Sequence, residues 1–316
     1  MNSFNTLLHA EHTGHEGISG FLGESLGVFG EFLDEVIIHA ILETLTLVPF
    51  LFIAYLLMEF IEHKAGDKAK SVMEKAGKLG PLVGGALGVL PQCGFSAAAA
   101  NLYTGRVISI GTLVAVFLST SDEMLPILIA GNVDGTALLS IIIYKVVVAV
   151  IAGFAVDVAF RIICRRQDDV AIHDMCEDEG CHCEDGILRS ALKHTASVTL
   201  SCFIIIVALN ALLFFVPTEA IAAIIPDIPV VSHLICAIVG LIPNCAASVA
   251  LSQLALKGVI TVGEMLAGLF AGAGVGVLIL FKMNKNIKEN FIILGIVVAF
   301  GAVFGAVADL IPWFAI

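Results

Sequence analysis

The chain has 316 residues, of which 59% are hydrophobic and only 14% are charged, and its mean hydropathy is +1.01. Soluble globular domains carry about 25% charged residues, so this composition excludes an ordinary soluble protein. The net charge of −12 gathers in short loops, above all in residues 168–185, so it describes those loops rather than a fold. We expect no nucleic-acid partner.

Six apolar runs are long enough to cross a bilayer, which takes about 20 helical residues. They cover residues 37–62, 107–130, 135–162, 190–216, 259–281 and 289–313. Two further apolar stretches, 79–103 and 230–256, are interrupted near their middle by Pro91 and Pro243. We therefore predict an all-α integral membrane protein with eight to ten hydrophobic segments.

An internal repeat relates the two halves of the chain. Residues 90–115 align with residues 242–267 at a constant offset of 152. The matched positions are Pro91 with Pro243, Gln92 with Asn244, Cys93 with Cys245, Ser96 with Ser248, Asn101 with Gln253 and Gly111 with Gly263. The same offset relates Asp157 to Asp309. Because composition alone rarely produces such a match, we predict two homologous repeats.

The lysine distribution predicts that the two repeats have opposite orientations. Short cytoplasmic loops of membrane proteins are enriched in Lys and Arg. Residues 62–78 contain five lysines and their counterpart 217–229 contains none. Conversely, residues 132–135 contain none and residues 282–288 contain three. Arginines in the connection between the repeats indicate that it is cytoplasmic, which puts both termini outside.

An inverted repeat needs an odd number of membrane crossings in each half. Each half has three full spans plus the Pro-broken segment, whose arms of about 10–12 residues are short for a crossing. We expect these segments to be re-entrant hairpins that meet near the midplane; if their arms cross fully, the chain has ten spans with the same sidedness. The predicted units are a His-containing tail with an amphipathic helix (1–33), a first transmembrane repeat (34–162), a Cys/His/acidic linker (163–189) and a second transmembrane repeat (190–316).

Interrupted helices in inverted repeats are typical of secondary transporters, which bind substrate where the helices break. The recurrence of Pro-(Gln/Asn)-Cys-x-x-Ser in both halves favours a substrate site over two proline kinks with cysteine as filler. Carboxylates within a span are costly in lipid, and Asp122 and Glu123 therefore indicate the same function. The predicted ion-binding residues are Cys93, Cys245, Asp122, Glu123, Gln92, Asn244, Asn101, Gln253, Ser96 and Ser248.

Other ionisable side chains lie within the spans or at their ends, and we interpret them as coupling or gating residues. They are Lys145, Glu264, His39, Glu43, His194, Asp157 and Asp309. Lys145 either pairs with Asp122 or Glu123, acts as a charge exchanged during transport, or reaches the interface by snorkelling. The histidines either relay protons or face a polar interface.

The hydrophilic linker carries a second cluster of metal-binding residue types. It contains Cys164, His173, Cys176, Cys181, His182 and Cys183. The Cys-x-Cys spacing suits soft or borderline metals, but no zinc-finger spacing is met. We interpret the linker as a flexible cytosolic segment that gathers or senses metal, with a solvated acidic linker as the alternative.

The chain resembles the ten-transmembrane heavy-metal exporter family, whose members include arsenic efflux proteins and manganese transporters. The resemblance is carried by residues 90–128, by residues 240–282 and by the linker motif GCHCEDG at 180–186. It implies the export of a heavy-metal ion.

We therefore expect a multi-pass secondary transporter of the inner membrane that exports Mn²⁺ or a similar divalent transition metal. Thiols, carboxylates, amides and hydroxyls together suit such an ion, and an arsenic, metalloid or organic-anion permease is the alternative. The sequence contains no GxxxxGK[ST] motif, so we expect neither ATP hydrolysis nor another enzymatic activity. The expected partners are the lipid bilayer, the metal ion and protons or counter-ions, with a homo-oligomer left open and no tightly bound cofactor.

Overall fold

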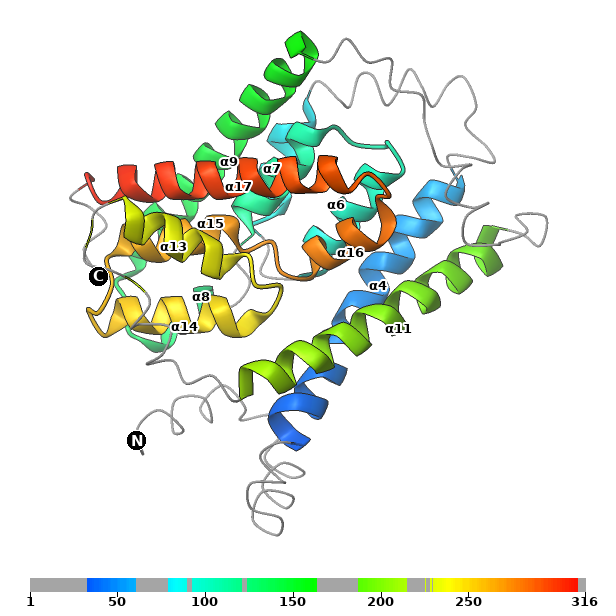
Figure 1. The fold of residues 1–316 in the computed structure, drawn as a ribbon, viewed down its shortest axis with the longest axis horizontal. Helices are drawn as coiled ribbons and strands as arrows, with labels where there is room; N and C mark the ends of the chain where they lie inside the picture. Colours follow the sequence, from blue (N-terminus) through cyan, green and yellow to red (C-terminus); the bar gives the residue numbers. More distant parts are fainter. Residues whose placement is uncertain are drawn as a thin grey trace.

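The computed structural model describes residues 33–60, 79–89, 93–120, 124–163, 187–214 and 230–311, together with residues 225 and 228. All regular structure in these ranges is helical, which confirms the predicted all-α class (Figure 1). The helices are η1 (Leu33–Ile38), α4 (His39–Phe60), α6 (Cys93–Thr104), α7 (Ile110–Ser119), α8 (Met124–Ala130), α9 (Gly135–Ile163), α11 (Ile187–Phe214), α13 (Val231–Gly240), α14 (Cys245–Leu256), α15 (Val262–Ala271), α16 (Val275–Met283) and α17 (Ile287–Ala308). Residues 79–87 are also helical.

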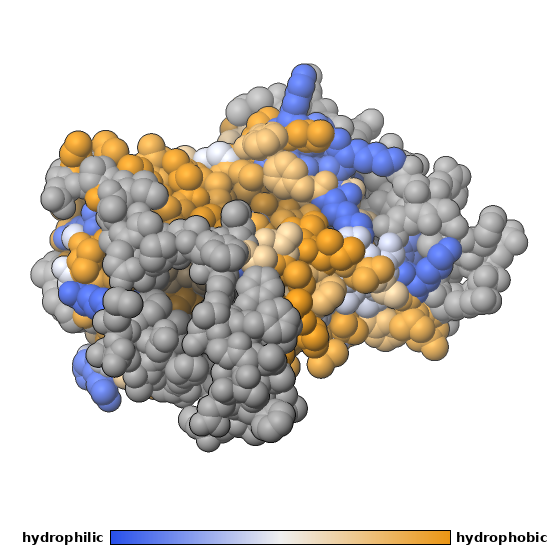
Figure 2. Space-filling view, turned by 60° about the horizontal axis from the view of Figure 1, so that its bottom comes forward, coloured by the Kyte–Doolittle hydropathy of each residue, from blue (hydrophilic) through white to orange (hydrophobic). Residues whose placement is uncertain are grey.

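Six stretches of the described chain are long and apolar enough to cross a membrane. They are Val36–Leu57, Ile110–Ala130, Gly135–Ile162, Ala191–Ala211, Val262–Met283 and Ile287–Ala308, and each overlaps one of the runs predicted from sequence. Large apolar side chains such as Leu45, Ile53 and Phe291 are exposed. Figure 2 shows this apolar surface over much of the described molecule, as expected where lipid rather than water is the solvent.

The two central spans each consist of two shorter helices. α7 ends at Ser119 and α8 begins at Met124, while α15 ends at Ala271 and α16 begins at Val275. The second interruption requires glycine, because Gly274 has φ 51° and ψ −136°. Each half therefore carries a second break besides the one between its hairpin arms.

The internal repeat extends to the boundaries of the helices. α6 and α14 begin at Cys93 and Cys245, and both have 12 residues. α7 and α15 also begin 152 positions apart, and both have 10 residues. The turn after each hairpin contains one left-handed residue, Arg106 with φ 58° and Gly258 with φ 68°. The two halves therefore share local geometry as well as sequence.

A carboxylate from the last helix of the first half holds the start of α7. Asp157 of α9 accepts hydrogen bonds from the Ser109 hydroxyl (2.8 Å) and from the Gly111 backbone N–H (2.8 Å). Ser109 is itself the N-cap of α7. The first N–H groups of a helix lack intrahelical partners and carry partial positive charge, so a carboxylate is stabilising there. We call Ser109, Gly111 and Asp157 the first clasp.

The second half repeats this arrangement. Asp309, the C-cap of α17, accepts hydrogen bonds from the Thr261 hydroxyl (2.7 Å) and from the Gly263 backbone N–H (2.7 Å). Thr261 is the N-cap of α15, and Glu264 completes a capping box with it. These three residues, Thr261, Gly263 and Asp309, form the second clasp, and each lies 152 positions after its counterpart in the first clasp.

The repeated helices pack partly within their own half and partly across the two halves. α7 packs on α9 and α15 packs on α17. Across the halves, α6 packs on α16, and the corresponding α14 packs on α8. α4 and α11 run side by side (Figure 1), and α4 also packs on α6. Because α14 is equivalent to α6 and α8 is equivalent to α16, the two contacts across the halves are the same contact made twice. A twofold relation between the repeats produces such a pair of contacts.

The close approach at the clasps predicts which glycines tolerate a methyl group. A Cβ on Gly111 would lie 2.1 Å from the Gly153 carbonyl oxygen, whereas a Cβ on Gly295 in α17 would meet nothing within 4 Å. Gly111→Ala should therefore lower stability by about 1–3 kcal/mol, and Gly295→Ala should be neutral or raise it by up to about 1 kcal/mol. Thermal unfolding of the purified full chain in detergent measures both; a Gly111→Ala variant as stable as Gly295→Ala would contradict the packing.

Candidate functional site

The C-terminal ends of α7 and α15 meet at a buried lysine. Lys145 of α9 is 0% exposed, and its ammonium donates hydrogen bonds to the carbonyl oxygens of Thr120 and Leu269 (3.1 Å for the latter). The ammonium also lies 5.7 Å from the centroid of the Phe270 ring. Helix C-termini carry partial negative charge, so a cation is favoured at this junction. The burial excludes the snorkelling alternative for Lys145.

Lys145 breaks the symmetry of the repeat. The equivalent residue of α17 is Val297, which is also fully buried but apolar. One ammonium therefore serves the ends of two equivalent helices. Thr120, one of its acceptors, directly precedes the segment Ser121-Asp122-Glu123 in the sequence.

Two amide side chains at equivalent positions have buried polar atoms without hydrogen-bond partners. Asn101 of α6 is 0% exposed, and in the described part of the chain neither its Nδ2 nor its Oδ1 has a partner. The same holds for Oε1 of Gln253 in α14. An unsatisfied buried polar group costs about 1–3 kcal/mol, and about 90% or more of such groups are paired. This feature recurs at equivalent positions of the two halves, which makes the two amides candidates for ligand binding.

A hydroxyl beside Gln253 belongs to the same region but was missed by the sequence analysis. Ser252 is fully buried, and its Oγ also has no partner among the described residues. Its counterpart in the first half is Ala100, so the repeat gave no signal for it. Ser96, which was predicted, is fully buried in α6, whereas Ser248 is partly exposed.

Asn244 is largely committed to local structure. Its Oδ1 accepts from the backbone N–H of Ala246 (2.7 Å), which caps α14, and its Nδ2 donates to Asn210 of α11. Asn210 in turn reaches the Val36 carbonyl oxygen (3.5 Å). This chain of amides ties the break of the second hairpin to the α4–α11 pair.

Several predicted site residues lie outside what the structure describes. These are Gln92, Asp122, Glu123, the side chains of Cys93 and Cys245, and all six linker residues, Cys164, His173, Cys176, Cys181, His182 and Cys183. Among the residues that are described, no three His, Cys, Asp or Glu side chains gather as a metal site. The roles of these residues stay predictions.

Two predicted coupling residues of α4 lie next to each other on that helix, and the one in α11 contacts α4. His39 Nδ1 is 3.9 Å from a carboxylate oxygen of Glu43, one turn along α4. The His194 ring of α11 stacks on Tyr55 of α4 at 5.2 Å between centroids. Glu264, by contrast, accepts from the Thr261 N–H at 2.8 Å and thus serves the start of α15.

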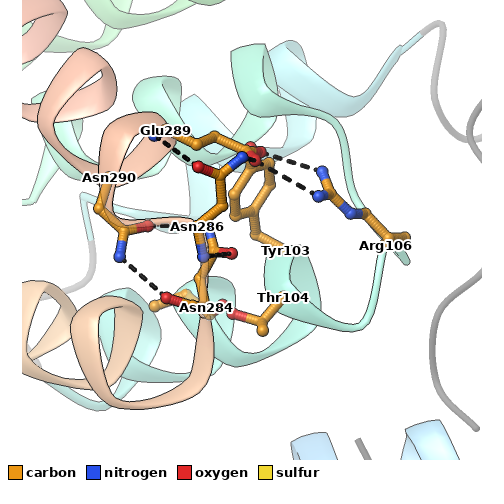
Figure 3. Close-up of polar contacts among 8 residues, drawn as sticks. Tyr103, Thr104, Arg106, Asn284, Asn286, Glu289 and Asn290 are labelled. Carbon is orange, nitrogen blue, oxygen red and sulfur yellow. Dashed lines mark hydrogen bonds and ion pairs between the residues drawn. The ribbon is translucent and has the colours of Figure 1, made fainter. Parts of the chain in front are cut away.

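A polar network joins the two halves at one end of the molecule (Figure 3). The Arg106 guanidinium lies 3.0 and 3.4 Å from the two carboxylate oxygens of Glu289. The Tyr103 hydroxyl donates to the same carboxylate, and Asn286 caps α17 beside it. We call Tyr103, Arg106 and Glu289 the latch.

The latch has no counterpart at the equivalent positions of the repeat. These positions hold Ala255, Gly258 and Ala137, none of which has a polar side chain. The sequence analysis missed the latch because its partners are separated by more than 180 residues. The charges on Arg106 and Glu289 were its only signal.

The unpaired amide of Asn101 predicts an unusual response to mutation. Asn290 provides a matched control, because it is also 0% exposed but donates to the Asn284 and Leu280 carbonyl oxygens. Asn290→Leu should lower stability by about 1–3 kcal/mol, whereas Asn101→Leu should leave it unchanged or raise it. Thermal unfolding of the ligand-free protein measures both; equal losses in the two variants would show that Asn101 has a structural partner.

Comparison with known proteins gives the family. A family model described as "Putative, 10TM heavy-metal exporter" matches residues 33–216, from η1 to just beyond α11. No curated protein and no solved structure matches the chain. The family match covers more than half of the chain and agrees with the all-helical fold and its candidate spans. The chain belongs to this family of ten-transmembrane heavy-metal exporters.

Proposed function

We propose that the protein is a secondary transporter that exports a divalent heavy-metal ion, such as Mn²⁺, through a site between the two broken hairpins. The observation that carries this proposal is the pair of buried, unpaired amides, Asn101 and Gln253. They lie at equivalent positions of α6 and α14, the hairpin arms that begin with Cys93 and Cys245. The family to which the chain belongs supports export of a heavy metal.

The donor types available at this site suit a metal of intermediate hardness. Thiolates from Cys93 and Cys245 and amide oxygens from Asn101 and Gln253, about 12 Å further along the same two helices, would offer successive donors along the path, and these donor types favour transition metals over Mg²⁺. Asp122 and Glu123, which follow Thr120 closely in the sequence, would supply negative charge. The ion would enter as substrate and would leave again, which fits a site without the closed Cys/His cage of a structural metal centre.

We also propose that the two repeats have opposite orientations, and the latch supports this. Arg106 precedes the candidate span Ile110–Ala130, as its equivalent Gly258 precedes the span Val262–Met283. In parallel repeats Arg106 and Gly258 would lie on the same face of the membrane. Glu289 follows Gly258 after one span, so it would then lie on the other face, about 30 Å from Arg106. The 3.0 Å contact between Arg106 and Glu289 therefore supports the inverted arrangement.

The lysines around the latch indicate its side of the membrane. Lys282, Lys285 and Lys288 all lie within seven positions of Glu289. Because such loops are cytoplasmic by the positive-inside rule, the latch would close the cytoplasmic face of an inner-membrane protein. The linker would then lie in the cytoplasm, where its cysteines and histidines would collect metal for export.

Lys145 would couple metal binding to a positive charge of the protein itself, because the two cations repel each other. Its ammonium already occupies the junction of two helix C-termini, which are also favourable positions for a transported cation. A second cation close to this ammonium is unfavourable in a medium of low dielectric constant. The entry of metal would therefore require Lys145 to move or to lose its proton, as expected for an exchanger.

Transport measurements test the proposed site. Purified protein in proteoliposomes should carry Mn²⁺, and the double variant Cys93→Ala/Cys245→Ala should lower the rate by about tenfold or more. The double variant Cys202→Ala/Cys236→Ala is the matched control, because both cysteines are buried and outside the repeated motif. Equal rates in the two double variants would contradict the site, and transport of arsenite without Mn²⁺ would favour the metalloid permease.

Cysteine accessibility tests the inversion. Lys70 and Ala222 occupy the lysine-rich loop 62–78 and its equivalent 217–229. In intact cells an impermeant maleimide should label Ala222→Cys, and it should label Lys70→Cys only after the membrane is opened. Labelling of both variants from the same side would show that the repeats are parallel.

A further inference from the structure

A buried histidine joins the second clasp. His233 lies in the first turn of α13, its side chain is only 7% exposed, and its Nε2 is 3.0 Å from Oδ2 of Asp309. We propose that His233 and Asp309 form a proton-binding site that couples proton movement to metal transport. This inference rests on the proposed transport function and assigns its coupling ion.

The first clasp shows that helix capping does not require the histidine. Asp157 makes the same two hydrogen bonds as Asp309, at nearly the same lengths. The residue equivalent to His233 is Pro81, which cannot bind a proton and lies close to Gly153 of α9. The clasps are therefore structural elements of both halves, and the second one carries an additional titratable group.

The histidine ring has one nitrogen available for a proton. Its Nε2 faces the Asp309 carboxylate, while its Nδ1 is buried and has no partner within the described residues. A neutral ring that donates from Nε2 to Asp309 keeps a lone pair on Nδ1. A proton from water can bind there without breaking the contact with Asp309, and the resulting imidazolium is stabilised by the adjacent carboxylate.

The helices packed against α13 carry both acidic and basic groups. α13 packs against α15, α17 and α14. Their nearby ionisable groups are Glu264 in the first turn of α15, Asp309 of α17 and Lys257 at the C-cap of α14. Cys236 is buried one turn further along α13. Asp309 is 27% exposed, so the carboxylate side of the pair is accessible to solvent.

The position of His233 connects this proton to the metal site. α13 is the first arm of the second hairpin and leads through the break at Leu241–Asn244 into α14, which carries Gln253. The protonated pair would hold the start of α13 against α15 and α17, and loss of the proton would weaken this hold. In the proposed orientation the second clasp lies on the membrane face opposite the latch. The clasp and the latch would therefore act at opposite ends of the transport path.

Direct titration tests whether the pair binds a proton. In ¹⁵N-histidine spectra of the full-length protein in micelles, the signal absent from His233→Gln identifies His233. This signal should change between about pH 5 and 8, and Asp309→Asn should shift the midpoint of the change. An invariant signal over this range, or a midpoint unaffected by Asp309→Asn, overturns the proposal.

Transport under a pH gradient tests the coupling. His233→Gln retains a donor toward Asp309, and its Mn²⁺ transport with an inward proton gradient is compared with its own rate without one. An inward proton gradient should accelerate the wild type by about fivefold or more and leave His233→Gln unaffected. Asp157→Asn is the matched control, since it weakens a clasp without a histidine and should keep the response to the gradient.

The outcomes separate the coupling site from the transport function. Equal acceleration of His233→Gln and wild type overturns the coupling site while transport stands. If the wild type carries no Mn²⁺ at any pH but His233 titrates with Asp309, the proposed cargo fails and the proton-binding site is retained.

Discussion

The structure depends on how the ends of broken helices are satisfied within a membrane. Lipid offers no hydrogen bonds to the free N–H and C=O groups at such ends, so protein groups must pair with them or line a cavity that does. Here the starts of α7 and α15 receive the carboxylates of Asp157 and Asp309. Their C-terminal ends share the ammonium of Lys145. Each charge is matched to the sign of the helix end that it contacts.

The features that hold the fold are repeated, whereas the features that carry a titratable or mobile charge occur once. Both clasps are present, but Lys145, His233 and Glu289 correspond to Val297, Pro81 and Ala137. Two identical inverted halves would give inward-facing and outward-facing states of equal energy, with no preferred response to either compartment. Single charges remove this degeneracy, and a transporter needs that asymmetry to couple its states to an ion.

Hydropathy predicted the spans because a lipid-facing helix must be apolar along its whole length, and the six runs were recovered with small shifts at their ends. The repeat was visible because Pro, Cys and Gly recur at a fixed spacing. The contacts of the charged residues were not predictable. Asp157 reaches Gly111 across 46 positions and Arg106 reaches Glu289 across 183, and no local pattern encodes such partners. The break at Gly274 was also missed, because small apolar residues continue the hydropathy signal through it.

The unpaired amides of Asn101 and Gln253 distinguish a binding site from a packing defect. A single buried polar group without a partner is an ordinary imperfection, and nothing selects for it twice at equivalent positions. Here it recurs in the two helices that start with the repeated cysteines. A ligand that offers a positive charge to both amide oxygens would repay the cost of leaving them unpaired.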